Sequence, residues 1–144
     1  MSNRNQGRRP GGGRGRHESR EQVDWVGKFK IHWVTDQITK DTVDFARDFG
    51  KDLKDKNFSN SQIRNVYGEL KRIELKGYEN EKTSFLLLKP KVAYANSRQN
   101  NTGMNNFKNV FDKAYESIDC EKSFSNFMQI MEAILAYHKS FGGK

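Results

Sequence analysis

Apolar side chains recur every three or four positions along most of the chain after residue 40, which is the spacing of helices that bury one face. One such stripe follows Ser59, which stands three residues before Gln62 in the arrangement of a capping box. We expect this helix to end at Gly77, because a glycine commonly follows the last residue of a helix. Its predicted buried face comprises Ile63, Val66, Tyr67, Leu70 and Ile73.

Two further stripes predict helices in the C-terminal part of the chain. The first comprises Phe107, Val110, Phe111, Ala114 and Ile118, and the second comprises Phe124, Phe127, Met128, Met131, Ile134, Leu135 and His138. Gly142 and Gly143 are expected to end the second of these helices. The polar stretch 97–106 contains Gly103 and predicts a loop before them.

Two helices are expected elsewhere, and one segment stays undecided. Asp41 is the expected N-cap of a helix whose apolar positions are Val43, Ala46, Phe49 and Leu53. A helix from about residue 80 to residue 95 contains Pro90, which removes a backbone hydrogen bond, so a kink or a fresh start near Lys89 is expected. In the segment 24–39, Trp25, Phe29 and Trp33 fall at helical spacing, whereas Phe29, Ile31 and Trp33 alternate as in a strand.

With no sheet predicted elsewhere, the fold class expected is all-α: a compact bundle of about five helices with short connections. Residues 23–144 are expected to form this bundle as a single domain. Residues 1–22 have no apolar residue after Met1 and place arginines among glycines between Arg8 and Arg16, which predicts a disordered Arg/Gly-rich N-terminal tail. Such a tail suits loose contact with phosphates and exposed bases, and it equally suits a solubilising or cloning-derived leader.

The formal net charge of +8 indicates an anionic partner, either nucleic acid or a membrane surface. The excess is local: residues 1–20 carry +5, and residues 59–99 carry eight bases and four acids, for +4. Residues 21–58 sum to −1, and residues 100–144 sum to zero. The tail and one middle segment therefore hold the whole excess.

Two basic faces lie in this middle segment. Arg64, Gly68, Lys71 and Arg72 fall on one helical face, where the glycine suggests close approach of a phosphate backbone or of another helix. Lys91, Tyr94 and Arg98 share a second face, just after Lys89. Either face alone also fits an ordinary solvated surface with Tyr94 in the core. The two together favour contacts with phosphates, which position a protein on nucleic acid without reading its sequence.

The sequence offers little for catalysis. None of the three histidines, His17, His32 and His138, has a second histidine or a cysteine at metal-ligand spacing, and no glycine-rich phosphate loop joins a strand to a helix. We therefore expect no enzyme activity, no metal and no cofactor. The longest apolar runs fall far short of the roughly 20 residues of a membrane span. With one cysteine, Cys120, and no secretory signal, a cytoplasmic location is expected.

Three blocks of sequence together suggest a family. They are Ser61-Gln62-Ile63-Arg64-Asn65-Val66-Tyr67, then Leu87-Leu88-Lys89-Pro90-Lys91-Val92-Ala93-Tyr94-Ala95 with Arg98, and finally Phe124 to Phe127 with Met131 to His138 before Gly142-Gly143. In this order and at this spacing, over roughly residues 57–143, the chain resembles the small subunit of the type III-A CRISPR effector, the Csm complex.

The resemblance implies a non-catalytic helical protein of antiviral defence that stacks in several copies, head to tail, and holds the backbone of target RNA paired with CRISPR RNA. Its partners would be these two RNAs and the other Csm-complex subunits. Arg64, Lys89, Lys91 and Arg98 would be the phosphate contacts, and the face argument adds Lys71 and Arg72. Tyr67 and Tyr94 would be structural. The tail and the segment from Trp25 to Trp33 lie outside the recognised pattern.

Two other hypotheses remain open at this point. A free-standing, nonspecific single-stranded nucleic-acid-binding protein would explain both the tail and the net charge. A small helical ribonuclease of the HEPN type would need an arginine followed four to six positions later by a histidine, and no histidine here has one at that distance.

Overall fold

The computed structural model describes residues 22–144, which contain helices and no strand, so the predicted all-α fold is confirmed. The helices are α2 (Trp25–Lys28), α3 (His32–Thr35), α4 (Lys40–Asp55), α5 (Arg64–Lys76), α6 (Lys82–Leu86), α7 (Leu88–Gln99), α8 (Thr102–Glu116) and α9 (Glu121–Ser140), with short 3-10 turns at Asn60–Gln62 and Tyr78–Asn80. The predictions on residues 1–21 lie outside the described residues. The domain boundary after residue 22 stays a prediction.

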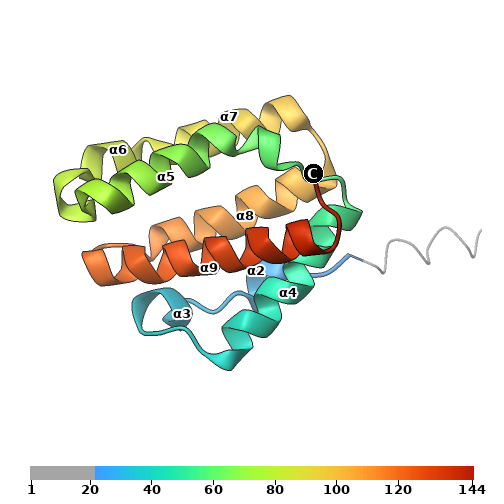
Figure 1. The fold of residues 1–144 in the computed structure, drawn as a ribbon, viewed down its shortest axis with the longest axis horizontal. Helices are drawn as coiled ribbons and strands as arrows, with labels where there is room; N and C mark the ends of the chain where they lie inside the picture. Colours follow the sequence, from blue (N-terminus) through green and yellow to red (C-terminus); the bar gives the residue numbers. More distant parts are fainter. Residues whose placement is uncertain (1–21) are drawn as a thin grey trace, which may run out of the picture.

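The helices form three layers (Figure 1). α8 and α9 lie in the middle, α5, α6 and α7 cover one side of them, and α2, α3 and α4 cover the other. The interior between the layers is rich in phenylalanine. The fully buried phenylalanines are Phe29, Phe49, Phe85, Phe107, Phe111, Phe124 and Phe127. Burial of these large rings contributes strongly to the stability of the fold.

The undecided segment is helical. Trp25, Phe29 and Trp33 are buried on α2, α3 and the turn between them, whereas Ile31 is exposed, so the helical spacing describes this segment correctly. The indole Nε1 of Trp25 donates a hydrogen bond of 3.0 Å to Oδ2 of Asp52 on α4. Both tryptophans contact Phe45, which fixes these short helices on α4.

The predicted start of α4 was wrong by two residues. Thr39 is the N-cap, its backbone amide donates to Thr42 Oγ1 at 2.9 Å, and Asp41 lies in the first turn. Val43 is exposed, whereas Thr42 and Phe45 are buried. The buried face is rotated toward Phe45 because the aromatic residues of α2 and α3 pack there.

The connections flanking α5 differ in detail from the prediction. Ser59 opens a 3-10 turn, and its hydroxyl accepts from the amide of Ser61 at 3.2 Å, so α5 itself begins only at Arg64. The end predicted at Gly77 is confirmed, since this glycine has a φ of +97°. Helix α6 ends before Leu87 and α7 begins at Leu88, which is the interruption expected near Pro90.

The loop predicted at residues 97–106 was largely wrong. Helix α7 runs to Gln99 and α8 starts at Thr102, because Asn100 adopts the left-handed conformation and the side chain of Asn101 accepts from the amide of Met104 at 2.8 Å. Gly103 lies within α8 against another part of the chain. A Cβ there would lie 2.7 Å from the carbonyl oxygen of Lys56, so the site requires glycine.

Candidate nucleic-acid interface

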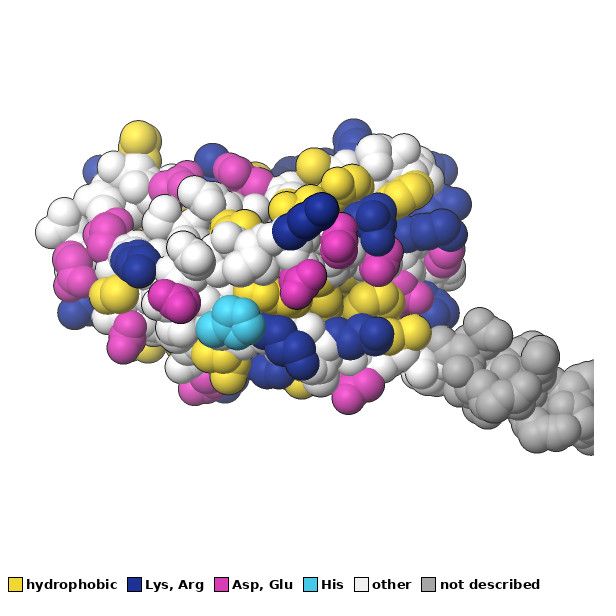
Figure 2. Space-filling view, turned by 90° about the horizontal axis from the view of Figure 1, so that it is seen from below, with side chains coloured by type: hydrophobic (Ala, Val, Ile, Leu, Met, Phe, Trp, Pro, Cys, Tyr) yellow, Lys and Arg dark blue, Asp and Glu magenta, His cyan; other side chains and the backbone are white. Residues whose placement is uncertain are grey.

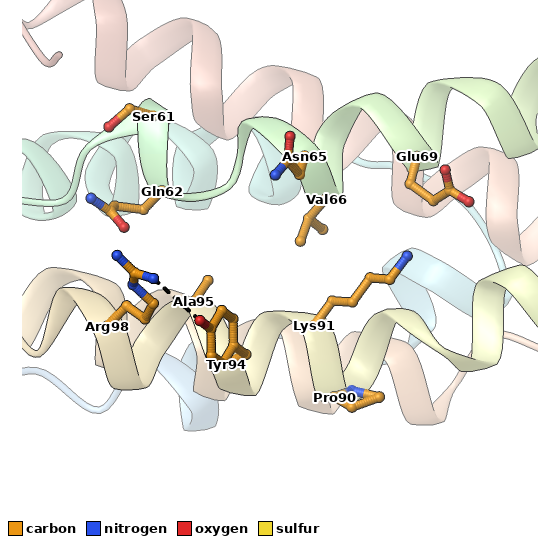
Figure 3. A pocket seen from close by; sticks show the side chains of 10 residues that line it. All are labelled: Ser61, Gln62, Asn65, Val66, Glu69, Pro90, Lys91, Tyr94, Ala95 and Arg98. Carbon is orange, nitrogen blue, oxygen red and sulfur yellow. Dashed lines mark hydrogen bonds between the residues drawn. The ribbon is translucent and has the colours of Figure 1, made fainter.

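A groove of about 900 Å³ lies between α5 and α7. Figure 3 shows its lining: α7 presents Lys91, Tyr94 and Arg98 toward α5, and the opposite side presents Gln62, Asn65 and Glu69. Ser61, Val66, Pro90 and Ala95 complete it. The groove lies where α7, which begins two residues before Pro90, runs beside α5, and the apolar Val66 and Ala95 line it between the two helices. We call it the α5–α7 groove.

Lys91 and Arg98 are the two predicted contact residues that lie together in the α5–α7 groove. Neither forms an ion pair with any residue of the described range 22–144. Seven residues apart on α7, they share one face of the helix. Both charges are therefore available to an anion.

Tyr94 lies between these two cations in the sequence and in the groove (Figure 3). The residue is 63% exposed, which contradicts its interpretation as part of the core. Arg98 Nη1 donates a hydrogen bond of 3.2 Å to the Tyr94 hydroxyl, and the guanidinium carbon lies 5.8 Å from the ring centroid. The hydrogen bond to the hydroxyl raises the pKa of Arg98, which stays fully charged.

The groove also contains a carboxylate, Glu69, whose charge is matched. Arg72 binds both of its oxygens, with Nε to Oε1 at 3.2 Å and Nη2 to Oε2 at 2.8 Å. This bidentate contact lowers the pKa of Glu69, so the carboxylate is ionised at neutral pH. Because Arg72 neutralises Glu69, the positive charges of Lys91 and Arg98 determine the net charge of the groove.

Arg72 is consequently not a free cation. Besides Glu69, its Nη2 lies 2.9 Å from Oε1 of Glu81 and donates to the hydroxyl of Ser84 at 2.9 Å. These contacts raise the pKa of the guanidinium and join α5 to the start of α6. The position suits a structural role better than the phosphate contact that the sequence suggested.

Lys71 and Lys89 are also paired with carboxylates. Lys71 Nζ lies 3.1 Å from Glu74 and 3.1 Å from Glu132, which joins α5 to α9, and these partners raise its pKa. Lys89 Nζ lies 2.6 Å from Glu116 Oε2 at the end of α8, and its pKa is raised as well. Both pairs are exposed, so water and salt screen them.

Arg64 lies in a different groove from Lys91 and Arg98. It lines a hollow between α5 and α9 that also contains Tyr67, Glu132 and two further lysines, Lys139 and Lys144. Like Lys91, it forms no ion pair within residues 22–144. The six predicted contacts thus divide into two in the α5–α7 groove, one in this second groove and three in ion pairs.

Gly68 lies on the outward face of α5, between the two grooves. No atom beyond its own helix lies within 4 Å of where a Cβ would be, so the chain itself supplies no close neighbour for this glycine. Among the described residues, no other helix makes the close approach to Gly68 that the sequence suggested.

The opposite side of the molecule is not a basic surface. Figure 2 views the molecule from below, the side on which α2, α3 and α4 lie, and shows Lys and Arg side chains interspersed with Asp and Glu. Most charges on α4 form local pairs, among them Lys51 with Asp55 at 3.2 Å and Arg47 with Asp48 at 3.0 Å. Most cations of α4 are thus neutralised locally, whereas Lys91 and Arg98 in the α5–α7 groove form no ion pair within residues 22–144.

The remaining reactive side chains of residues 22–144 do not converge on a site. His138 is buried, and its Nε2 lies 3.0 Å from the carbonyl oxygen of Phe58. Cys120 is an exposed free thiol. Within the described range there is no group of three or more His, Cys, Asp or Glu residues able to hold a metal ion, and no helix long and apolar enough to span a membrane.

Sequence reasoning missed two lining residues, Gln62 and Asn65. Their spacing from Glu69 (i, i+3, i+7) places all three on one side of α5 and its preceding turn, and this pattern was available in the sequence. Carboxamides are uncharged, so the distribution of charge along the sequence does not reveal them.

The fold and the groove define a small helical protein with a groove that contains two unpaired cations. The model of the family Csm2 Type III-A matches residues 36–144, and the chain belongs to this family of small subunits of the type III-A CRISPR Csm complex. The resemblance read from the sequence blocks is therefore confirmed. Comparisons with curated proteins and with solved structures gave no match. Helices α2 and α3 precede the matched region.

Proposed function

We propose that this protein is a non-catalytic subunit that holds the backbone of target RNA paired with CRISPR RNA in the type III-A complex. The observation that carries the proposal is the pair of unmatched cations, Lys91 and Arg98, on one face of α7. Such cations bind phosphates by releasing counterions and do not discriminate sequence, which suits a complex whose target varies with its guide. We also place the complex in the cytoplasm.

Arg64 extends the proposed RNA-binding surface across α5. It shares the second groove with Lys139 and Lys144, so three cations accompany the single carboxylate Glu132, which already pairs with Lys71. Three other cations are already paired with carboxylates, namely Lys71, Arg72 and Lys89. In this proposal they attract RNA through the long-range electrostatic field of the protein more than through direct contact with phosphates.

Charge reversal in the reconstituted complex tests this function. The double variant Lys91→Glu/Arg98→Glu should lose target-RNA capture while the complex still assembles. The matched control is Lys40→Glu/Lys122→Glu, which makes the same charge change at exposed residues in the first turns of α4 and α9, where a glutamate is favourable. Equal capture by the two variants would contradict the assigned groove.

We further infer that copies of the subunit associate head to tail through two unlike surfaces. The candidate surfaces are the segment from Trp25 to Trp33 and the C-terminal end of the chain from Phe141 to Gly143. Trp25 and Trp33 are buried, so on the first surface the exposed apolar residue is Ile31, and on the second it is Phe141. Either Ile31→Glu or Phe141→Glu should reduce the number of copies per complex, measured as particle mass, and an unchanged mass for both variants would exclude these surfaces.

The non-catalytic part of the proposal has its own test. Purified protein incubated with labelled RNA, with and without magnesium, should leave the RNA intact. Cleavage that co-purifies with the protein and is lost on mutation of the chain would overturn it.

A further inference from the structure

We propose that Tyr94 and Arg98 form a stacking site for an unpaired nucleobase inside the α5–α7 groove. The inference deepens the proposed function and rests on it, since it assumes that an RNA strand follows the cations of α7. It adds a class of ligand that phosphate contacts alone do not specify, namely a nucleotide that is not base-paired.

The first observation that supports the proposal is that the Tyr94 ring is exposed and yet held in place. A tyrosine ring is a large apolar surface, yet Tyr94 is 63% exposed, whereas Tyr78 of the same protein is buried against Phe85 and Phe124. Arg98 holds the ring from one side through the hydroxyl, with its guanidinium 5.8 Å from the centroid. A ring that is exposed and yet oriented is preorganised for stacking, so little freedom is lost when a base binds.

The second support is the chemistry across the groove. Gln62 points toward α7 from the opposite side (Figure 3), Asn65 lines the same groove from α5, and their carboxamides make no side-chain hydrogen bond with any described residue. A carboxamide offers both donors and an acceptor, which can pair with the edge of any base. Val66 and Ala95 supply an apolar surface between the two sides. A flat heterocycle with polar edges fits this set of groups better than a bare phosphate does.

The third support is the spacing of the cations around the ring. Lys91 and Arg98 are seven residues apart on α7, or about 10.5 Å along its axis, and Tyr94 lies between them. A strand running along α7 would then place phosphates on both sides of a base stacked on Tyr94. Within an A-form duplex every base is already paired and stacked, so the ring would meet only a nucleotide at an end, a bulge or an interruption of the duplex.

The test compares two oligonucleotides of equal length and charge, one a single strand with bases and the other built from abasic units. Both present the same phosphates to the full-length protein, so a difference in dissociation constant measures the contribution of the bases. We expect the strand with bases to bind about 5- to 150-fold more tightly, the range for stacking of one base on an aromatic side chain. Equal affinity of the wild type for the two strands would overturn the stacking site.

Variants of Tyr94 test whether this residue causes the tighter binding of the strand with bases. Tyr94→Leu keeps an apolar side chain without a π face and should abolish the preference for bases while leaving affinity for the abasic strand unchanged. Tyr94→Phe keeps the ring and should retain most of the preference, although Arg98 loses its hydroxyl partner. A preference that persists undiminished in Tyr94→Leu would place base contacts elsewhere on the chain and overturn the proposal.

The failures of the two proposals are distinguishable. If the abasic strand binds and Lys91→Gln/Arg98→Gln weakens that binding, the phosphate contacts stand whatever Tyr94 does. If neither strand binds and the assembled complex with Lys91→Gln/Arg98→Gln captures its target RNA as well as the wild type does, the proposed function fails and the stacking site fails with it.

Discussion

His138 Nε2 lies 3.0 Å from the carbonyl oxygen of Phe58, and the two rings meet edge to face with centroids 5.1 Å apart. The contact joins the end of α9 to the turn after α4, which are 80 residues apart in the chain. His138 is fully buried, and its other ring nitrogen, Nδ1, has no hydrogen-bond partner. Protonation would place a proton on this unpartnered buried atom.

The first prediction concerns the pH dependence of stability. Desolvation lowers the pKa of His138, and this effect outweighs the opposing hydrogen bond to Phe58. Because the unfolded state then binds more protons, the full stability is present above the ordinary histidine pKa of about 6.5 and is lost progressively as the pH falls below it. The free energy of unfolding in urea should decrease between pH 7.5 and pH 5.5.

His138→Gln provides the control, because glutamine does not titrate. Its free energy of unfolding should be lower than that of the wild type at pH 7.5 and should change less between the two pH values. An equal change in both proteins would show that other groups cause the pH dependence.

The second prediction compares two glycines in helices. Gly50 of α4 lies against α9, where a Cβ would be 2.8 Å from the amide nitrogen of His138 and 3.0 Å from the carbonyl oxygen of Ile134. Backbone atoms cannot move aside easily, so Gly50→Ala should destabilise the fold by about 1–3 kcal/mol, the usual cost of overpacking. Gly68→Ala meets no neighbour and should stabilise the fold by about 0.5–1 kcal/mol, because alanine favours the helix.

Urea unfolding of the two alanine variants measures this difference. A Gly50→Ala protein as stable as the wild type would contradict the close contact between α4 and α9. The Gly68→Ala protein also has a binding readout. If its affinity for RNA falls although its stability rises, the open face at Gly68 is where the RNA backbone approaches.

The third prediction ranks the cations by their contribution to RNA binding. Lys91→Gln should lower the number of counterions released by about one, which appears as a smaller slope of log affinity against log salt concentration. Lys89→Gln should change this slope less, because Lys89 already pairs with Glu116 at 2.6 Å. The two variants have the same net charge, so each is the matched control of the other. A larger slope change for Lys89→Gln would reverse the ranking.

The fourth prediction concerns the ion-pair network of Arg72. Arg72→Met keeps much of the side-chain volume but leaves Glu69 and Glu81 unpaired at the junction of α5 and α6. The pairs are partly exposed and water screens them, so we expect only a small decrease in the free energy of unfolding. Affinity for RNA should fall as well, because an unmatched Glu69 then faces Lys91 in the groove. Unchanged affinity in Arg72→Met would show that RNA does not pass Glu69.

The sequence predicted the helices well where an apolar stripe and a stop signal coincide, as at Gly77 and Pro90. It failed at residues 97–106, where asparagines were interpreted as a loop. Asn100 and Asn101 instead end one helix and begin the next, and polar composition alone does not distinguish a long loop from two adjacent caps.

The candidate site could be predicted only in part, because pairing depends on tertiary contacts. The spacing of Lys91 and Arg98 on one helix was visible in the sequence. The partner of Lys71 is Glu132, 61 residues away, and the partner of Lys89 is Glu116, 27 residues away. Without the fold, nothing distinguished these paired lysines from the free ones, and nothing showed that Arg64 faces a different groove.

Ultraviolet cross-linking of RNA to protein in the native complex, followed by mass spectrometry of the cross-linked peptides, tests the central claim most directly. We predict cross-links within residues 60–69 and 88–99, which form the two sides of the α5–α7 groove, with Tyr94 among the modified residues. Cross-links confined to α2, α3 and α4, or a purified complex in which this subunit acquires none, would contradict the account.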